Sequence, residues 1–158
     1  MPQTSVTLDP NEAMDGQLNE AAPHFRESML VNEATGIPFG RAVNLVSGAL
    51  KTVDLTDATG EASAAYGVAA RNPTYPADTS LYADNDGITV VRSGIVTVQV
   101  EDAVVKGAAP FIRFVAGGGG SALGSFRSDA DTASAAENTS WEYLDNAAAA
   151  GFARVWIK

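Results

Sequence analysis

Residues 88–100 read ITVVRSGIVTVQV, and this stretch decides the fold class of the chain. Its second half alternates valines with polar side chains, placing Val96, Val98 and Val100 on one side and Thr97, Gln99 and Glu101 on the other. A period of two is what a half-buried antiparallel strand requires. β-Branched residues are equally dense before the Arg92-Ser93-Gly94 break, so we predict strand structure on both sides of it.

Outward from this stretch, residues 39–158 carry further short strand patterns separated by turn residues. We predict strands at 41–46, 49–55, 64–70, 111–115, 123–127 and 151–158, and an exposed loop or single helical turn at 129–140. The first two strands form a predicted hairpin around Ser47-Gly48. Short strands at close spacing are typical of sandwiches and small barrels. We therefore predict an all-β domain over 39–158, either a compact β-sandwich, possibly a jelly roll, or a small β-barrel.

Residues 1–38 show no comparable order. They contain prolines, glycines and scattered apolar residues without a sustained rhythm. We interpret them as an extended N-terminal arm that cannot bury itself and that attaches to another protein. An arm of about 35 residues spans at most on the order of 115 Å when extended.

Composition and charge exclude several classes of function. The 158 residues suffice for one domain, and 46% of them are hydrophobic. The absence of cysteine excludes disulfides and thiolate metal sites. The net charge of −9, without a basic cluster, argues against nucleic acid and anionic bilayers as partners. No apolar run predicts a membrane span, and no leader pattern is present.

Candidate chemical motifs are weak, and we predict no catalytic residues, no metal site and no cofactor. His24 is the only histidine, so several histidines cannot share a metal. Asp84-Asn85-Asp86-Gly87 resembles part of a calcium loop, but Tyr82 and Ser93 would occupy its first and last ligand positions. The glycine run at 117–120 is not followed by the Lys-Ser/Thr pair of a phosphate-binding loop. A hydrolase is disfavoured because no oriented acid, base or nucleophile set is evident.

Aromatic residues offer an alternative function. Tyr75, Tyr82, Trp141 and Tyr143 lie in or beside predicted loops. Such a set could stack on sugar rings, which would make the protein a glycan- or receptor-binding module. The same residues could instead close over the end of a β-sandwich, because aromatic side chains dominate buried core area.

The chain resembles the bacteriophage head-decoration proteins, often called structural cement proteins. The resembling segments are GIPFGRAV at 36–43, YGVA at 66–69, SGIVTV at 93–98, VVKGAAPF at 104–111 and GFARVWI at 151–157. The resemblance implies a non-enzymatic protein on the outer surface of the virion, made in the cytoplasm of a bacterial host. It further implies homotrimers at threefold and quasi-threefold positions that clamp neighbouring major capsid proteins.

We expect the arm to supply the contacts with the major capsid protein. The predicted partner-binding residues are Pro23, His24, Phe25, Arg26, Met29, Leu30 and Val31. The apolar members would contribute about 1.5–3 kcal/mol each if fully buried. Ordering the arm opposes this by about 1–2 kcal/mol per residue, so one arm would bind weakly. A trimer that presents three arms to a repeating lattice gains by effective concentration.

Overall fold

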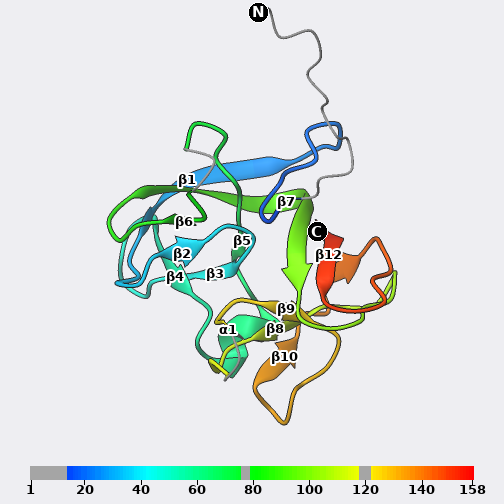
Figure 1. The fold of residues 1–158 in the computed structure, drawn as a ribbon. Helices are drawn as coiled ribbons and strands as arrows, with labels where there is room; N and C mark the ends of the chain where they lie inside the picture. The colour runs from blue at the N-terminus through cyan, green and yellow to red at the C-terminus, as the bar shows by residue number, and fades with distance from the viewer. Residues whose placement is uncertain (1–13, 76–78, 118–121) are drawn as a thin grey trace, which may run out of the picture.

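The long strand β7 (Gly87–Val100) covers the stretch that the alternation predicted and takes part in both halves of the molecule (Figure 1). The computed structural model describes residues 14–75, 79–117 and 122–158. The other elements in chain order are β1 (Phe25–Val31), β2 (Ile37–Pro38), β3 (Ala42–Leu45), β4 (Thr52–Leu55), α1 (Thr59–Ser63), β5 (Gly67–Ala69), β6 (Leu81–Tyr82), β8 (Phe111–Arg113), β9 (Phe126–Arg127), β10 (Ala135–Glu137), β11 (Trp141–Tyr143) and β12 (Gly151–Ile157). The predicted all-β class is confirmed.

The first half of β7 belongs to a small closed barrel. Its strands follow the order β1-β4-β3-β5-β7, and β7 closes the ring by pairing antiparallel with β1. The predicted hairpin is present as the antiparallel pair β3 and β4. The barrel encloses the buried side chains of Met29, Val31, Ile37, Phe39, Val43, Val53, Leu55, Ala69, Tyr82, Ile88 and Val90. Of the two predicted architectures, the small barrel is therefore the one observed.

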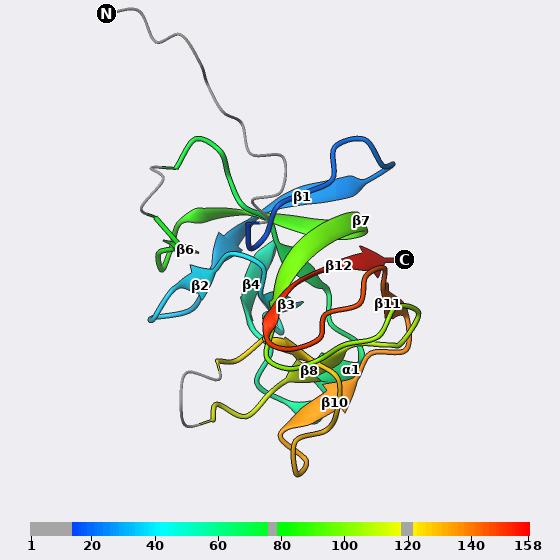
Figure 2. The same ribbon diagram turned by 45° about the vertical axis from the view of Figure 1, so that its right-hand side comes forward.

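The second half of β7 supports the C-terminal half of the chain. β12 pairs with it from Gly151 opposite Val100 to Ile157 opposite Gly94, and β11 pairs with β12. β9 joins β7 to β8, and β10 pairs with β8 near α1 (Figure 2). Their shared core contains Val96, Val98, Val100, Ile112, Phe126, Trp141, Tyr143, Ala153, Val155 and Ile157. The predicted alternation in β7 is thus confirmed, and β12 alternates in the same way, with Ala153, Val155 and Ile157 buried.

The predicted break at Arg92–Gly94 is a bend within one continuous strand. Gly94 has φ +133°, a conformation that L side chains rarely adopt, and a Cβ there would lie 2.7 Å from Cβ of His24. Pairing with β1 shifts register at the same place, between Phe25 and Arg26. The bend lets one strand serve two differently oriented sheets.

The structure corrects the interpretation of the N-terminal arm. Residues 16–19 hydrogen-bond along β7 through Gly16 N to Thr97 O (2.8 Å) and Asn19 N to Ile95 O (2.9 Å). Residues 25–31 form β1, a full member of the barrel. This part of the predicted arm is therefore not free, because β7 and β4 supply its backbone partners. Residues 1–13 lie outside the described residues, and for them an arm stays a prediction.

Two smaller features complete the picture. The segment predicted as a loop at 129–140 contains the short strand β10. Within the described ranges the only helix, α1, has five residues, and no helix is long and apolar enough to span a membrane.

Candidate functional site

The seven residues predicted to contact a partner divide into two groups. Met29 and Val31 point into the barrel core, with exposed fractions of 6% and 0%. Their prediction as partner anchors is wrong, because both side chains are already covered by the protein's own core. The sequence contained a weak signal for this burial. Met29 and Val31 are two positions apart, which is the spacing of residues that a strand buries on one face.

The remaining five residues stay at the surface to different degrees. Phe25 and Leu30 are the exposed apolar members, at 54% and 43%, and they lie near opposite ends of β1. Pro23 and Arg26 are exposed. His24 is partly buried, its Nε2 3.4 Å from Oε2 of Glu20, and its Nδ1 within hydrogen-bond distance of a backbone carbonyl. The structure therefore does not gather the predicted residues into one continuous patch.

A second set of exposed aromatic side chains lies on β12. Phe152 and Trp156 are 44% and 42% exposed, on the face of β12 opposite its buried residues. Trp156 is the cross-strand partner of Ile95, and Phe25 is that of Ser93. Phe25 and Trp156 thus lie opposite the two residues that flank Gly94, whereas Phe152 lies opposite Gln99, farther along β7. We call Phe25, Phe152 and Trp156 the aromatic surface.

Charged side chains hold the edge of this surface in place. The Lys158 ammonium lies 4.9 Å from the centroid of the Trp156 ring and 2.5 Å from Oε2 of Glu142. Arg154 donates to both carboxylate oxygens of Asp145 at 2.7 and 2.8 Å, and this pair lowers the pKa of Asp145. Aromatic residues with neighbouring arginines are enriched in protein interfaces, and tryptophan is prominent among residues that dominate binding energy.

Sequence reasoning missed Phe152 and Trp156 although the signal was present. β12 carries apolar residues on both faces, and a strand can bury only one face against a single core. The small and β-branched side chains turn inward, so the bulkier aromatics stay outside.

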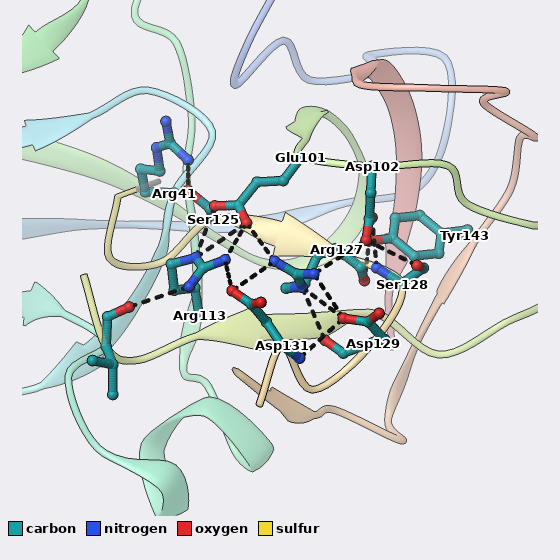
Figure 3. Close-up of polar contacts among 11 residues, drawn as sticks. Arg41, Glu101, Asp102, Arg113, Ser125, Arg127, Ser128, Asp129, Asp131 and Tyr143 are labelled. Carbon is teal, nitrogen blue, oxygen red and sulfur yellow. Dashed lines mark hydrogen bonds and ion pairs between the residues drawn. The ribbon is translucent and has the colours of Figure 1, made fainter. Parts of the chain in front are cut away.

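A buried ionic network links the end of β7 to β8, β9 and the loop before β10 (Figure 3). Arg113 is 2% exposed, and its Nη2 donates to Glu101 at 2.7 Å and to Asp131 at 2.6 Å. Burial alone would raise the pKa of Glu101, but hydrogen bonds from Arg113 outweigh it and lower that pKa. The same bonds raise the pKa of Arg113. Arg127 joins the network by donating to Glu101 at 3.0 Å.

This network anchors the loop between β9 and β10. Arg127 donates to Asp129 at 2.7 Å, while Asp131 contacts both arginines. Asp131, Thr132 and Ala133 all have positive φ, at 40°, 54° and 67°. Three successive non-glycine residues in this region are costly, so the surrounding contacts must hold the loop in one shape. The ionised carboxylates are occupied by guanidinium groups, an arrangement suited to holding structure rather than moving protons.

Asp54 on β4 has a raised pKa, in contrast to the lowered pKa of Glu101. Burial, then the negative charges of Glu61 and Asp57, raises the pKa of Asp54 from its ordinary 3.8 to about 6. One of its carboxylate oxygens is buried and has no hydrogen-bond partner within the described residues.

Replacing Asp54 with Asn is expected to stabilise the protein at neutral pH. A pKa raised in the folded state means that the ionised group destabilises the fold, fully above about pH 6 and not at all below the ordinary value of 3.8. Because the side chain is only partly buried, solvent screens part of this penalty, and the gain should be on the order of 1 kcal/mol at pH 7.5. Urea unfolding of both proteins at pH 7.5 and 3.5 tests this. An equal gain at both pH values would contradict it.

The sugar-binding alternative receives no support from the four aromatic residues. Tyr82, Trp141 and Tyr143 are buried, at 0%, 4% and 0% exposure, so they form no open stacking platform. Burial also raises the pKa of Tyr143. Asp84 and Asn85 form a tight turn just before β7, and the described residues contain no group of three or more metal-ligating side chains. Of the glycine run at 117–120, only Gly117 lies within the described residues.

Comparisons with known proteins agree with the fold. A family model described as structural cement protein (E217 gp24/Pam3 gp6) matches residues 1–158. A chain of the solved structure "The capsid of Myoviridae Phage XM1" superposes with a TM-score of 0.73 at 20% identity. The alignment covers 98% of this chain and 95% of that one. At this identity the likeness concerns the fold alone. No curated protein sequence matches the chain.

Proposed function

We propose, from the premise that the chain belongs to the structural cement protein family, that it binds the outer surface of a phage head and reinforces contacts between major capsid subunits. The family match over the whole chain is the observation that carries this proposal. The role we propose is structural and needs no catalytic step. It places the protein on the assembled virion.

The geometry supports this role through rigidity. A closed barrel and a salt-bridged C-terminal half share the single strand β7, so a load applied to one half passes to the other through a continuous strand. Two members of the exposed aromatic surface, Phe25 and Trp156, lie opposite β7 residues beside its bend. A cement protein needs such a stiff body, because flexible contacts would lose the binding energy to ordering.

We propose that three copies form a homotrimer at threefold or quasi-threefold positions. Stable interfaces bury about 1,200–2,000 Å² in total, and several linked contacts raise overall affinity without any new contact type. Residues 1–13 would add a tether that reaches a neighbouring subunit at most about 45 Å away. Sedimentation of the free protein gives its oligomeric state directly, and a monomer at all concentrations would contradict self-association.

Electron microscopy of heads assembled with and without this protein tests the central proposal. We expect added density on the outer shell and a higher temperature of head disruption when the protein is bound. Heads that acquire no density at saturating protein would contradict the proposed function.

The double substitution Phe152→Ala with Trp156→Ala is expected to weaken head binding about 30-fold or more, because a central aromatic residue commonly contributes at least about 2 kcal/mol. The fold should persist, since neither side chain belongs to the buried core. Leu50→Ala is the matched control, because Leu50 is 90% exposed on the turn between β3 and β4. Cosedimentation with heads measures the effect. Equal binding by the double variant and wild type would remove the aromatic surface from the interface.

A further inference from the structure

A surface hollow of about 340 Å³ lies between the N-terminal segment and the loop after β5. Met14, Leu18, Ala70 and Pro73 give it an apolar lining. Two arginines and one carboxylate, Arg26, Arg71 and Glu20, also border it, together with the neutral polar side chains of Gln17, Asn72 and Thr89. Its volume is at the lower end of the range of about 300–1,000 Å³ for ligand pockets. The hollow therefore suits a few side chains of a peptide segment better than a large cofactor.

The walls of the hollow are held by backbone hydrogen bonds between distant segments. Arg71 N donates to Gly16 O at 2.7 Å, and Ala70 N donates to Thr89 O at 2.8 Å. Gly16 has φ +74°, and a Cβ at this position would lie 2.8 Å from Arg71 N. The walls can approach this closely only because residue 16 is a glycine. The hollow is thus preformed in the folded chain.

Arg71 presents a prepared guanidinium group at this site. Its Nε donates to the backbone oxygen of Asp15 at 3.3 Å, and its Cζ lies 4.7 Å from the centroid of the buried Phe39 ring. These contacts fix one side of the guanidinium. Within the described residues, its two terminal nitrogens make no hydrogen bond or ion pair. Such a fork matches the two oxygens of a carboxylate.

Arg26 adds a second positive charge at the border. Its only ion pair in the described chain joins Nη1 to Oε1 of Glu20 at 3.3 Å. Both side chains are more than half exposed, so this pair is weak and readily exchanged. Two arginines beside an apolar lining distinguish this hollow on a chain whose net charge is −9.

We propose that the hollow receives a segment of the major capsid protein that places a carboxylate on Arg71 and an apolar side chain against Met14, Leu18 and Pro73. This inference rests on the proposed function, because it names the chemistry of one contact with the capsid. Arg71 supplies the directional hydrogen bonds, and the apolar lining supplies the burial. Because contacts with Asp15 and Phe39 already hold the Arg71 side chain, binding a carboxylate costs little additional side-chain entropy.

Head binding by Arg71 variants tests the proposal. Arg71→Met removes the fork while keeping an apolar stem, and should weaken binding to heads assembled without this protein about 10- to 100-fold. Arg71→Lys keeps the charge but not the planar fork, and should fall between wild type and Arg71→Met. Lys106→Met, which removes an exposed charge outside the hollow, is the control and should bind as wild type does.

Met14→Glu provides a second, independent variant in case Arg71→Met lowers stability. Met14 is 44% exposed, so the fold should tolerate a carboxylate that competes for Arg71 and weakens head binding. If Arg71→Met and Met14→Glu both bind heads as tightly as wild type does, the hollow is not the docking site, although the proposed function stands. If wild type does not bind heads, both proposals fail. Arg71-dependent binding of a synthetic peptide of residues 1–13 would assign the hollow to the chain's own N-terminus and overturn the capsid contact.

Discussion

A chain lacking residues 2–31 is expected not to fold, whereas a chain lacking only residues 2–13 should fold normally. The longer deletion removes β1, which closes the barrel between β4 and β7. It also removes the buried side chains of Met29 and Val31, each of which contributes about 1.5–3 kcal/mol. Together with the lost hydrogen bonds of β1, this loss of free energy approaches the whole stability of a typical domain, which is about 5–15 kcal/mol.

Near-ultraviolet circular dichroism and gel filtration of the two deletion variants measure this difference. A synthetic peptide of residues 14–31 should restore the native spectrum when it is added to the longer deletion variant, because it returns the missing strand. A longer deletion variant with a native spectrum and an unchanged melting temperature would show that β1 is dispensable. In that case the original interpretation of residues 25–31 as a free arm would be right.

The parts of the fold that could be predicted from the sequence are those with local periodicity. In the second half of β7 and in β12, alternate residues meet one core, and the spacing of the apolar residues shows this directly. The hairpin of β3 and β4 is equally local, because a short turn joins its strands. The closure of the barrel could not be read, since β1 and its partner residues on β7 are about sixty positions apart in the sequence.

The strand β1 shows why the arm was misread. Its sequence FRESMLV places apolar residues at 25, 29, 30 and 31, without a period of two. Glu27 interrupts the inward face, but Tyr66 donates a hydrogen bond to its carboxylate at 2.6 Å and Arg92 lies 3.5 Å away. Leu30 breaks the pattern on the outward face. Tertiary contacts thus override a local signal that favours irregular structure.

The ionic network was invisible for a related reason. Its members are dispersed over residues 101–131, and they meet because β9 pairs with both β7 and β8. One signal was available in the segment FIRFV at 111–115, where Arg113 interrupts an apolar run. A charged residue in a buried strand requires an ionised partner.

Substituting Arg113 with Met is expected to destabilise the protein by about 3 kcal/mol at pH 7. Removing one partner of a buried ion pair costs about 3–5 kcal/mol, because the other charge stays buried without compensation. The lower end applies here, since Asp131 is 41% exposed and Arg127 still donates a hydrogen bond to Glu101 in the variant. Arg154→Met is the control: its pair with Asp145 is half exposed and should contribute about 0–1 kcal/mol. Urea unfolding of the three proteins measures the difference.

The destabilisation by Arg113→Met should shrink as the solution is acidified. In wild type the pKa of Glu101 is lowered, so its contribution is complete above the ordinary value of 4.5 and is lost as the pH falls through the lower folded value. In the variant, Glu101 keeps its burial but loses the Arg113 hydrogen bonds, so its pKa should rise and protonation should relieve the strain. The two unfolding curves should therefore converge below about pH 4. A gap that stays constant between pH 7 and 3.5 would mean that Arg113 stabilises the fold through packing of its stem rather than through its charge.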